Sequence, residues 1–185
     1  VLPADAGVVL DVRVGERGDE ILACAHAYNA GMLVLGQATQ REGLFARIFR
    51  PSVPTEVVRA APCPILLVRA ASGTGRILVA TDLADPTWPT LRAGAAERVR
   101  TGGEVTVLHC IEPLAIIPSS ELAAAMAPSV DETLASATAM LERAAAEADL
   151  HATLQVEFGP ASGAILGLAR AMSADLIVVG THGRS

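Results

Sequence analysis

The stretch VEFGPASGAILGLARAMSADLIVVG at residues 156–180 decides the fold, because residues 12–36, VRVGERGDEILACAHAYNAGMLVLG, are a second copy of it. The copies align without a gap at an offset of 144 residues, and nine of 25 positions are identical. Each copy predicts a strand, a glycine turn, an amphipathic helix and a second strand ending in glycine. A chance match of Ala-rich segments is the alternative, but the glycines kept at both turns, Gly15/Gly159 and Gly36/Gly180, argue against it.

The chain between the copies alternates in the same way. We predict strands at 65–68, 77–82, 105–111 and 153–158, and helices at 43–60, at 88–101 and at 119–148, the last interrupted at Pro128. Strands that alternate with helices pair in parallel through right-handed crossovers. The sequence therefore predicts an α/β fold built as a tandem repeat.

The offset also predicts the domain boundaries. If one unit is about 144 residues long, residues 1–70 are the last part of a first unit and residues 76–185 are most of a second. Residues 71–75, rich in Gly and Ser, form the linker. The first unit lacks its opening strands, and the second lacks its last helix and strand. We expect this sequence to be an internal slice of a longer tandem protein.

Composition excludes several classes of partner. The chain is 51% apolar but only 3% aromatic, which suits parallel strands packed under Ala-rich helices. The net charge is −6 and the 14 basic residues are scattered, so we expect no nucleic-acid binding. No apolar run reaches the roughly 18 residues of a membrane helix. The three cysteines read as core residues of a reducing compartment. These features predict a cytoplasmic location without a membrane segment in this sequence.

Polar residues and glycines follow three predicted strands of the second unit. Asp82 ends ILVATD, His109 and Cys110 end VTVLHC, and Gly180 and Gly183 follow DLIVV. Open α/β sheets bind ligands at the carboxyl ends of their strands, where glycines let backbone N–H groups approach a phosphate. Each feature has a structural alternative: Asp82 can form an Asx turn or cap a helix, and His109 can be a packed core histidine.

Motifs of catalysis are missing. The sequence has no Gly-x-Ser-x-Gly, HExxH or P-loop pattern, and no ligand set at metal spacing. We therefore predict no metal site, no catalytic residue, and nucleotide binding with slow ATP hydrolysis at most.

Four stretches together resemble the universal stress protein family: ILVATDLADPTWPTL, EVTVLHCIEP, VEFGPASGAILGLARAMSADLIVVGTHGRS and PTEVVRAAPCPILLVRA. The resemblance implies an open, parallel, five-stranded sheet with helices on both faces, which is Rossmann-like and similar to the adenine nucleotide alpha hydrolases. It also implies self-association through the final strand of each unit. Some members of the family bind ATP and others do not.

For the second unit, the resemblance implies an adenine-nucleotide site that takes ATP, with or without Mg²⁺. Carried over by position, adenine would lie at the β-strand end formed by Ala80, Thr81 and Asp82, beside the Cys110 backbone. Ribose and phosphates would lie at Val179, Gly180 and Gly183. The pair Gly-Ser/Thr that closes the family motif would fall beyond Ser185.

The first unit departs from this motif. Gly36 is kept, but Thr39 stands where the second Gly is expected, and Pro51-Ser52 stands where Gly-Ser is expected. Proline removes an N–H donor at that point. We therefore expect a degenerate first unit that does not bind ATP.

Three functions remain open at this stage. The first is an ATP-binding regulatory protein of the stress response, with one competent and one degenerate site. The second is a dimerisation or interaction module that binds no nucleotide, for instance the regulatory part of a transporter. The third, an adenylate-transferring enzyme, has less support because no catalytic base or pyrophosphate loop is visible.

Overall fold

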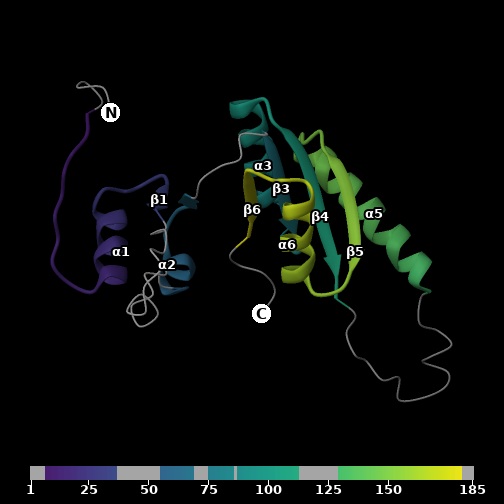
Figure 1. The fold of residues 1–185 in the computed structure, drawn as a ribbon, viewed down its shortest axis with the longest axis horizontal. Helices are drawn as coiled ribbons and strands as arrows, with labels where there is room; N and C mark the ends of the chain where they lie inside the picture. The colour runs from purple at the N-terminus through teal and green to yellow at the C-terminus, as the bar shows by residue number, and fades with distance from the viewer. Residues whose placement is uncertain (1–6, 37–54, 69–74, 86, 113–128, 181–185) are drawn as a thin grey trace, which may run out of the picture. The chain divides into compact units, whose positions relative to one another are not determined.

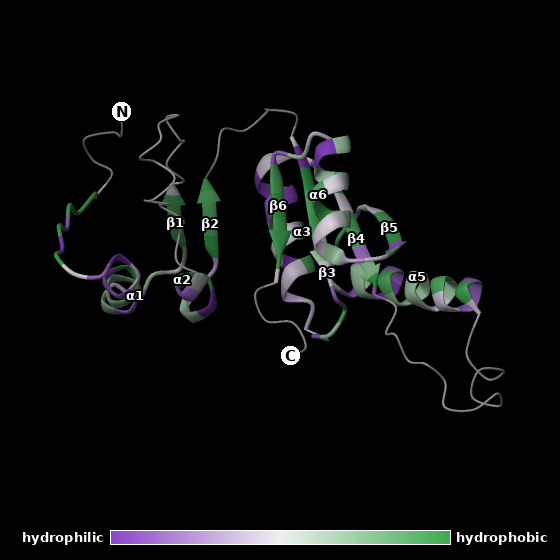
Figure 2. Ribbon diagram, turned by 60° about the horizontal axis from the view of Figure 1, so that its bottom comes forward, coloured by the Kyte–Doolittle hydropathy of each residue, from purple (hydrophilic) through white to green (hydrophobic). Residues whose placement is uncertain are grey.

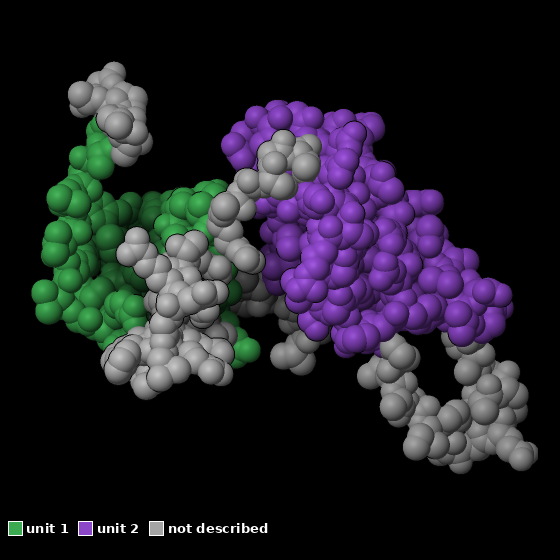
Figure 3. Space-filling model, in the orientation of Figure 1, with its two compact units in different colours: residues 1–70 green, residues 71–185 purple. Residues whose placement is uncertain are grey.

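The computed structural model describes residues 7–36, 55–68, 75–85, 87–112 and 129–180. The chain divides into two compact units, residues 1–70 and 71–185 (Figure 3). Each unit has a parallel sheet of its own. Within the described ranges, no helix combines the length and the hydropathy that a membrane span requires.

The described residues of the first unit form two helices and two short strands (Figure 1). In chain order they are α1 (Arg17–Ala27), β1 (Leu33–Gly36), α2 (Thr55–Ala60) and β2 (Ile65–Val68). The two strands pair in parallel, with Leu33 opposite Ile65 and Gly36 opposite Val68. The predicted strand at 65–68 is confirmed. The helix predicted at 43–60 is seen as α2, and its residues 43–54 lie outside the described part of the chain.

The strand predicted at the start of the first copy is wrong. Residues 7–16 contain no helix or strand, and the side chains of Val12 and Val14 are 82% and 97% exposed. The matching segment of the second copy is a strand because it pairs with a neighbouring strand. Among the described residues of the first unit, only β1 and β2 form a sheet. An apolar, extended segment without a partner strand leaves its backbone N–H and C=O groups unpaired, so it is not a strand.

The second unit follows the predicted alternation closely. Its elements are β3 (Arg76–Thr81), α3 (Pro89–Thr101), β4 (Glu104–Ile111), α5 (Val130–Glu147), β5 (Thr153–Phe158), α6 (Ala161–Ala171) and β6 (Leu176–Val179). The four strands pair in parallel in the order β5-β4-β3-β6. Part of the predicted helix 119–148 appears as α5, and residues 119–128 lie outside the described residues.

Local signals in the sequence fix where these helices begin and end. Proline is the first residue of α3, where its missing N–H costs nothing. Gly102 ends α3 with φ 70°, a left-handed conformation that favours glycine, and its N–H bonds to the carbonyl of Arg98 at 2.8 Å. Ser129 and Glu132 form a capping box at the start of α5, each side chain accepting the other's backbone N–H.

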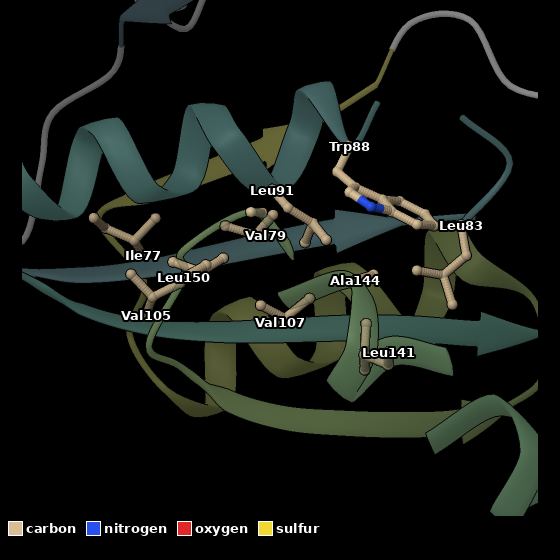
Figure 4. Packing of buried hydrophobic residues seen from close by; sticks show 11 residues of the cluster. Ile77, Val79, Leu83, Trp88, Leu91, Val105, Val107, Leu141, Ala144 and Leu150 are labelled. Carbon is tan, nitrogen blue, oxygen red and sulfur yellow. The ribbon is translucent and has the colours of Figure 1, made fainter. Parts of the chain in front are cut away.

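Helices cover both faces of the four-stranded sheet. On one face, α3 and α5 pack on alternate residues of the two central strands, and Val79, Leu91, Val107 and Leu141 are fully buried there (Figure 4). The opposite face carries Leu78 and Leu108, which are also buried, and Figure 1 shows α6 lying over it. Because both faces are covered, the central strands carry buried apolar residues on both sides, at positions 77–80 of β3 and 107–108 of β4, and the strands in Figure 2 are mostly green.

The α/β class with parallel sheets and helices is therefore confirmed, but the described sheets have two and four strands rather than five. Among the described residues, no fifth strand joins either sheet.

Candidate functional site

The candidate site lies where β3 and β6 end side by side. Ala80 pairs with Val179, so Asp82 and Gly180 follow directly from neighbouring strands. From β3 the chain runs through α3 to β4 on one side, whereas β6 is reached from β5 through α6 on the opposite face of the sheet. The direction of the connections reverses between β3 and β6, and open α/β sheets bind ligands at such a reversal.

Asp82 shapes the turn that follows β3. Its Oδ1 atom accepts a hydrogen bond from the backbone N–H of Ala84 at 3.0 Å, and Thr81 Oγ1 accepts one from the N–H of Leu83 at 3.1 Å. Asp82 therefore forms an Asx turn, which was its structural alternative. The side chain is exposed, and within the described ranges Oδ2 has no partner. One carboxylate oxygen thus supports the turn, and the side chain as a whole is exposed.

His109 braces the same strand end. Its Nδ1 lies 2.9 Å from the carbonyl oxygen of Thr81, which is its partner across the β3–β4 register. A carbonyl only accepts hydrogen bonds, so Nδ1 carries the proton and donates. His109 is half-buried and has a structural partner, which matches the interpretation of a packed histidine.

Cys110 is half-buried one residue further along β4, opposite Glu157 of β5. Burial raises the pKa of the Cys110 thiol, and the carboxylates of Glu157 and Glu112 raise it further. A thiol held in its neutral form is a poor nucleophile. At this edge of the sheet, Cys110 can therefore contact a ligand through its backbone rather than through its thiol.

Gly180 follows β6 and is exposed. A Cβ atom added there would lie 3.2 Å from the hydroxyl oxygen of Thr90, in the first turn of α3. In the first unit, no atom of the described residues lies within 4 Å of the same position at the aligned Gly36. Among the described residues, the two aligned glycines therefore have different neighbours.

Six of the seven predicted site residues lie at the carboxyl ends of three adjacent strands. These are Ala80 and Thr81 of β3 with Asp82 after it, Cys110 of β4, and Val179 of β6 with Gly180 after it. Gly183 lies outside the described residues, as do Thr39, Pro51 and Ser52 of the first unit's motif. Within the described ranges, no group of three or more metal-binding side chains forms. A shallow hollow elsewhere, between β5 and α6, includes neither Asp82 nor Gly180.

Sequence reasoning missed several residues that build this region. Thr90 gave no signal, because its neighbour Gly180 is distant in the chain. The Trp88 indole N–H donates to Glu147 Oε2 at 2.7 Å and links the start of α3 to the end of α5. Asp175 Oδ2 accepts the N–H of Gly75 and of Arg76, which fixes the start of β3 beside β6. The Asp in SADLIVV was the available hint, since a carboxylate just before a buried strand usually has a backbone partner.

A comparison with models of known families agrees with the repeat. The model of the universal stress protein family matches residues 3–69 and again 73–185. No curated protein matches the chain.

Solved structures show the same fold. A universal stress protein from Archaeoglobus fulgidus DSM 4304 superposes with a TM-score of 0.62 at 21% identity, over 96% of this chain and 59% of that one. A functionally unknown protein from Pseudomonas aeruginosa PAO1 gives a TM-score of 0.64 at 19% identity, over 93% and 59%. The chain thus spans less than two thirds of the length of either structure. With two matches of the family model that together cover almost every residue, the chain belongs to the universal stress protein family.

Proposed function

We propose that the second unit binds an adenine nucleotide, ATP in the first instance, at the carboxyl ends of β3 and β6, and that the protein acts by binding in a stress response. The observation that carries the proposal is the register of β3 and β6. Because Ala80 pairs with Val179, Asp82 and Gly180 follow the ends of two neighbouring strands at the point where the connections reverse, and the Asp82 side chain is exposed.

The β3 side of the edge suits the base and the ribose. Oδ2 of Asp82, which has no partner among the described residues, accepts a hydrogen bond from the exocyclic amine of adenine or from a ribose hydroxyl, while Oδ1 holds the turn. The β4 backbone at Cys110 lies one strand away and offers peptide groups to a flat base. His109 holds the Thr81 carbonyl in place and so keeps this side rigid.

The β6 side suits the phosphates. Gly180 begins the sequence GTHG, in which two glycines allow backbone N–H groups to approach an anion without a Cβ in the way. Val179 precedes it with an exposed side chain. We propose that the backbone of Gly183 also contacts the phosphates.

The same residues argue for binding rather than catalysis. The sequence contains no lysine, so no P-loop type lysine can reach the β- and γ-phosphates. His109 is engaged by a backbone carbonyl, and the thiol of Cys110 is kept neutral by its raised pKa. ATP hydrolysis is therefore slow at most, with or without Mg²⁺. A cytoplasmic location remains a prediction.

Self-association is a second candidate role, favoured by the first unit. Leu67 and Val68 of β2 are 41% and 44% exposed, and Val34 of the paired strand is 59% exposed. Apolar side chains on a short sheet suit contact with another protein surface. We propose self-association through β2, with a first unit that does not bind ATP. The alternative function for the whole protein is a dimerisation or interaction module. In that case the protein acts through this contact and binds no nucleotide.

The test measures the nucleotide in the full chain as purified without added ligand, by denaturation and chromatography. Four proteins are compared: the wild type, Asp82→Ala, Asp82→Asn and, as a surface control on α5, Asp131→Ala. The Asn side chain keeps an oxygen for the Ala84 N–H, so it preserves the turn while removing the carboxylate. Trp88, the single tryptophan, reports by fluorescence whether each variant is folded.

Stoichiometric adenine nucleotide in the wild type and in Asp131→Ala, reduced in both Asp82 variants, supports the proposal. If the wild type carries no nucleotide and binds none when ATP is added, the proposal is wrong and the interaction module is the better account.

A further inference from the structure

Thr90 is the second residue of α3, and its hydroxyl lies at the β6 side of the candidate site. A Cβ atom at Gly180 would be 3.2 Å from Thr90 Oγ1. Side chains alternate along a strand, and Val178 faces the core that α3 covers, so position 180 faces α3 as well. Pro89, one residue earlier, starts the helix and thereby sets the position of Thr90.

The Thr90 hydroxyl has no hydrogen-bond partner among the described residues, although the side chain is half-buried. Among the described residues of this unit, the hydroxyls of Thr81, Thr87, Thr101 and Thr133 have partners, whereas those of Thr106, Thr138 and Thr153, like that of Thr90, have none; Thr90 differs from these three in lying beside Gly180. A hydroxyl carries one donor and two acceptor sites, so Thr90 keeps its full capacity for a molecule that arrives at the end of β6.

Glycine at position 180 leaves the space beside this hydroxyl open. Any larger residue would place its Cβ against Oγ1, closer than an ordinary contact. Gly36 of the first unit has no such neighbour in the part of the chain that the structure describes. The combination of a glycine and a helix hydroxyl is therefore found in the second unit among the described residues.

We propose that Thr90 is a binding residue that donates a hydrogen bond from its hydroxyl to a phosphate oxygen of the nucleotide, and so favours nucleoside phosphates over nucleosides. This rests on the proposed function. The proposed function assigns the base to the β3 side at Asp82 and the phosphates to the β6 side at Gly180. Thr90 lies beside Gly180 and therefore on the phosphate side. Hydrogen bonds to an anionic oxygen are about twice as strong as bonds between neutral groups, so the effect is concentrated on the phosphate.

The test uses the full chain and compares AMP, ATP and adenosine by calorimetric titration. Thr90→Val removes the hydroxyl at constant shape and similar helix propensity, and Thr90→Ser keeps the hydroxyl. Thr138→Val, a half-buried threonine within α5, is the control for the chemical change itself. Thermal unfolding followed by Trp88 fluorescence checks that each variant is folded.

We expect Thr90→Val to weaken AMP and ATP about tenfold or more, as the loss of a hydrogen bond to a charged group does, and to leave adenosine unchanged. Thr90→Ser and Thr138→Val should stay close to the wild type. An equal loss for adenosine and AMP, or no loss for either, overturns the role of Thr90.

The same titrations separate this inference from the proposed function. If the wild type binds AMP, Asp82→Ala does not, and Thr90→Val binds normally, then only the inference about Thr90 is wrong. If the wild type binds none of the three compounds, both are wrong.

Discussion

Gly94 sits in the middle of α3 and allows that helix to lie close against β3. An added Cβ would be 2.6 Å from Val79 Cγ2, and Val79 is fully buried in the centre of the sheet. Carbon atoms pack best at about 3.5–4.0 Å, so Gly94→Ala must open this contact by about 1 Å. Both groups are anchored in regular secondary structure, so neither moves without disturbing the core shown in Figure 4.

A matched substitution separates this overpacking from helix propensity. Gly167 lies in the interior of α6, and no atom of the described residues is within 4 Å of the added Cβ. Gly167→Ala should therefore stabilise the protein by about 1 kcal/mol through propensity alone. Gly94→Ala should gain the same amount of stability from helix propensity but lose about 2–3 kcal/mol through overpacking. Its free energy of unfolding should therefore fall by about 1–2 kcal/mol. The two variants should differ by about 2–3 kcal/mol in free energy of unfolding.

Urea unfolding of the full chain measures this difference. Trp88 is the single tryptophan and is buried in the same core, so its fluorescence follows the second unit alone. With a slope of about 1–3 kcal/mol per molar urea, the unfolding midpoints should differ by about 1–2 M. A Gly94→Ala midpoint equal to or above that of Gly167→Ala would refute the close packing. Val79→Ala should relieve the contact, so it should cost less in Gly94→Ala than in the wild type.

Two further predictions concern the capping box at the start of α5 and the raised pKa of the Cys110 thiol. Ser129→Ala removes one half of the capping box of α5 and should lower the free energy of unfolding by about 1 kcal/mol, measured by urea unfolding; Ser129→Asp, which keeps a capping oxygen, should not. The raised pKa of Cys110 leaves less thiolate at pH 8, so its alkylation, followed by mass spectrometry, should be slower than in the urea-unfolded chain. Glu157→Gln removes a charge that raises this pKa and should speed the reaction in the folded protein; an unchanged rate would contradict the assigned cause.

Much of the candidate site could be predicted from the sequence because strand ends carry local signals. The apolar runs before Asp82 and before Gly180 are long enough to mark buried parallel strands. Parallel strands bring their carboxyl ends to one edge, so the two residues had to share that edge once the strands paired. The repeat indicated the same order of elements in both units.

The sequence by itself determined the repeat, the alternation of strands and helices, and the helix ends set by Pro89, Gly102 and Ser129. These depend on local propensity and on periodicity, which the chain carries residue by residue. Only the tertiary structure decided which extended segments pair with a neighbouring strand. Residues 12–14 repeat a strand pattern and yet form none, since a strand exists only beside another strand. The approach of Thr90 to Gly180 and of Trp88 to Glu147 depends on how α3 packs against the sheet and α5, which no local pattern encodes.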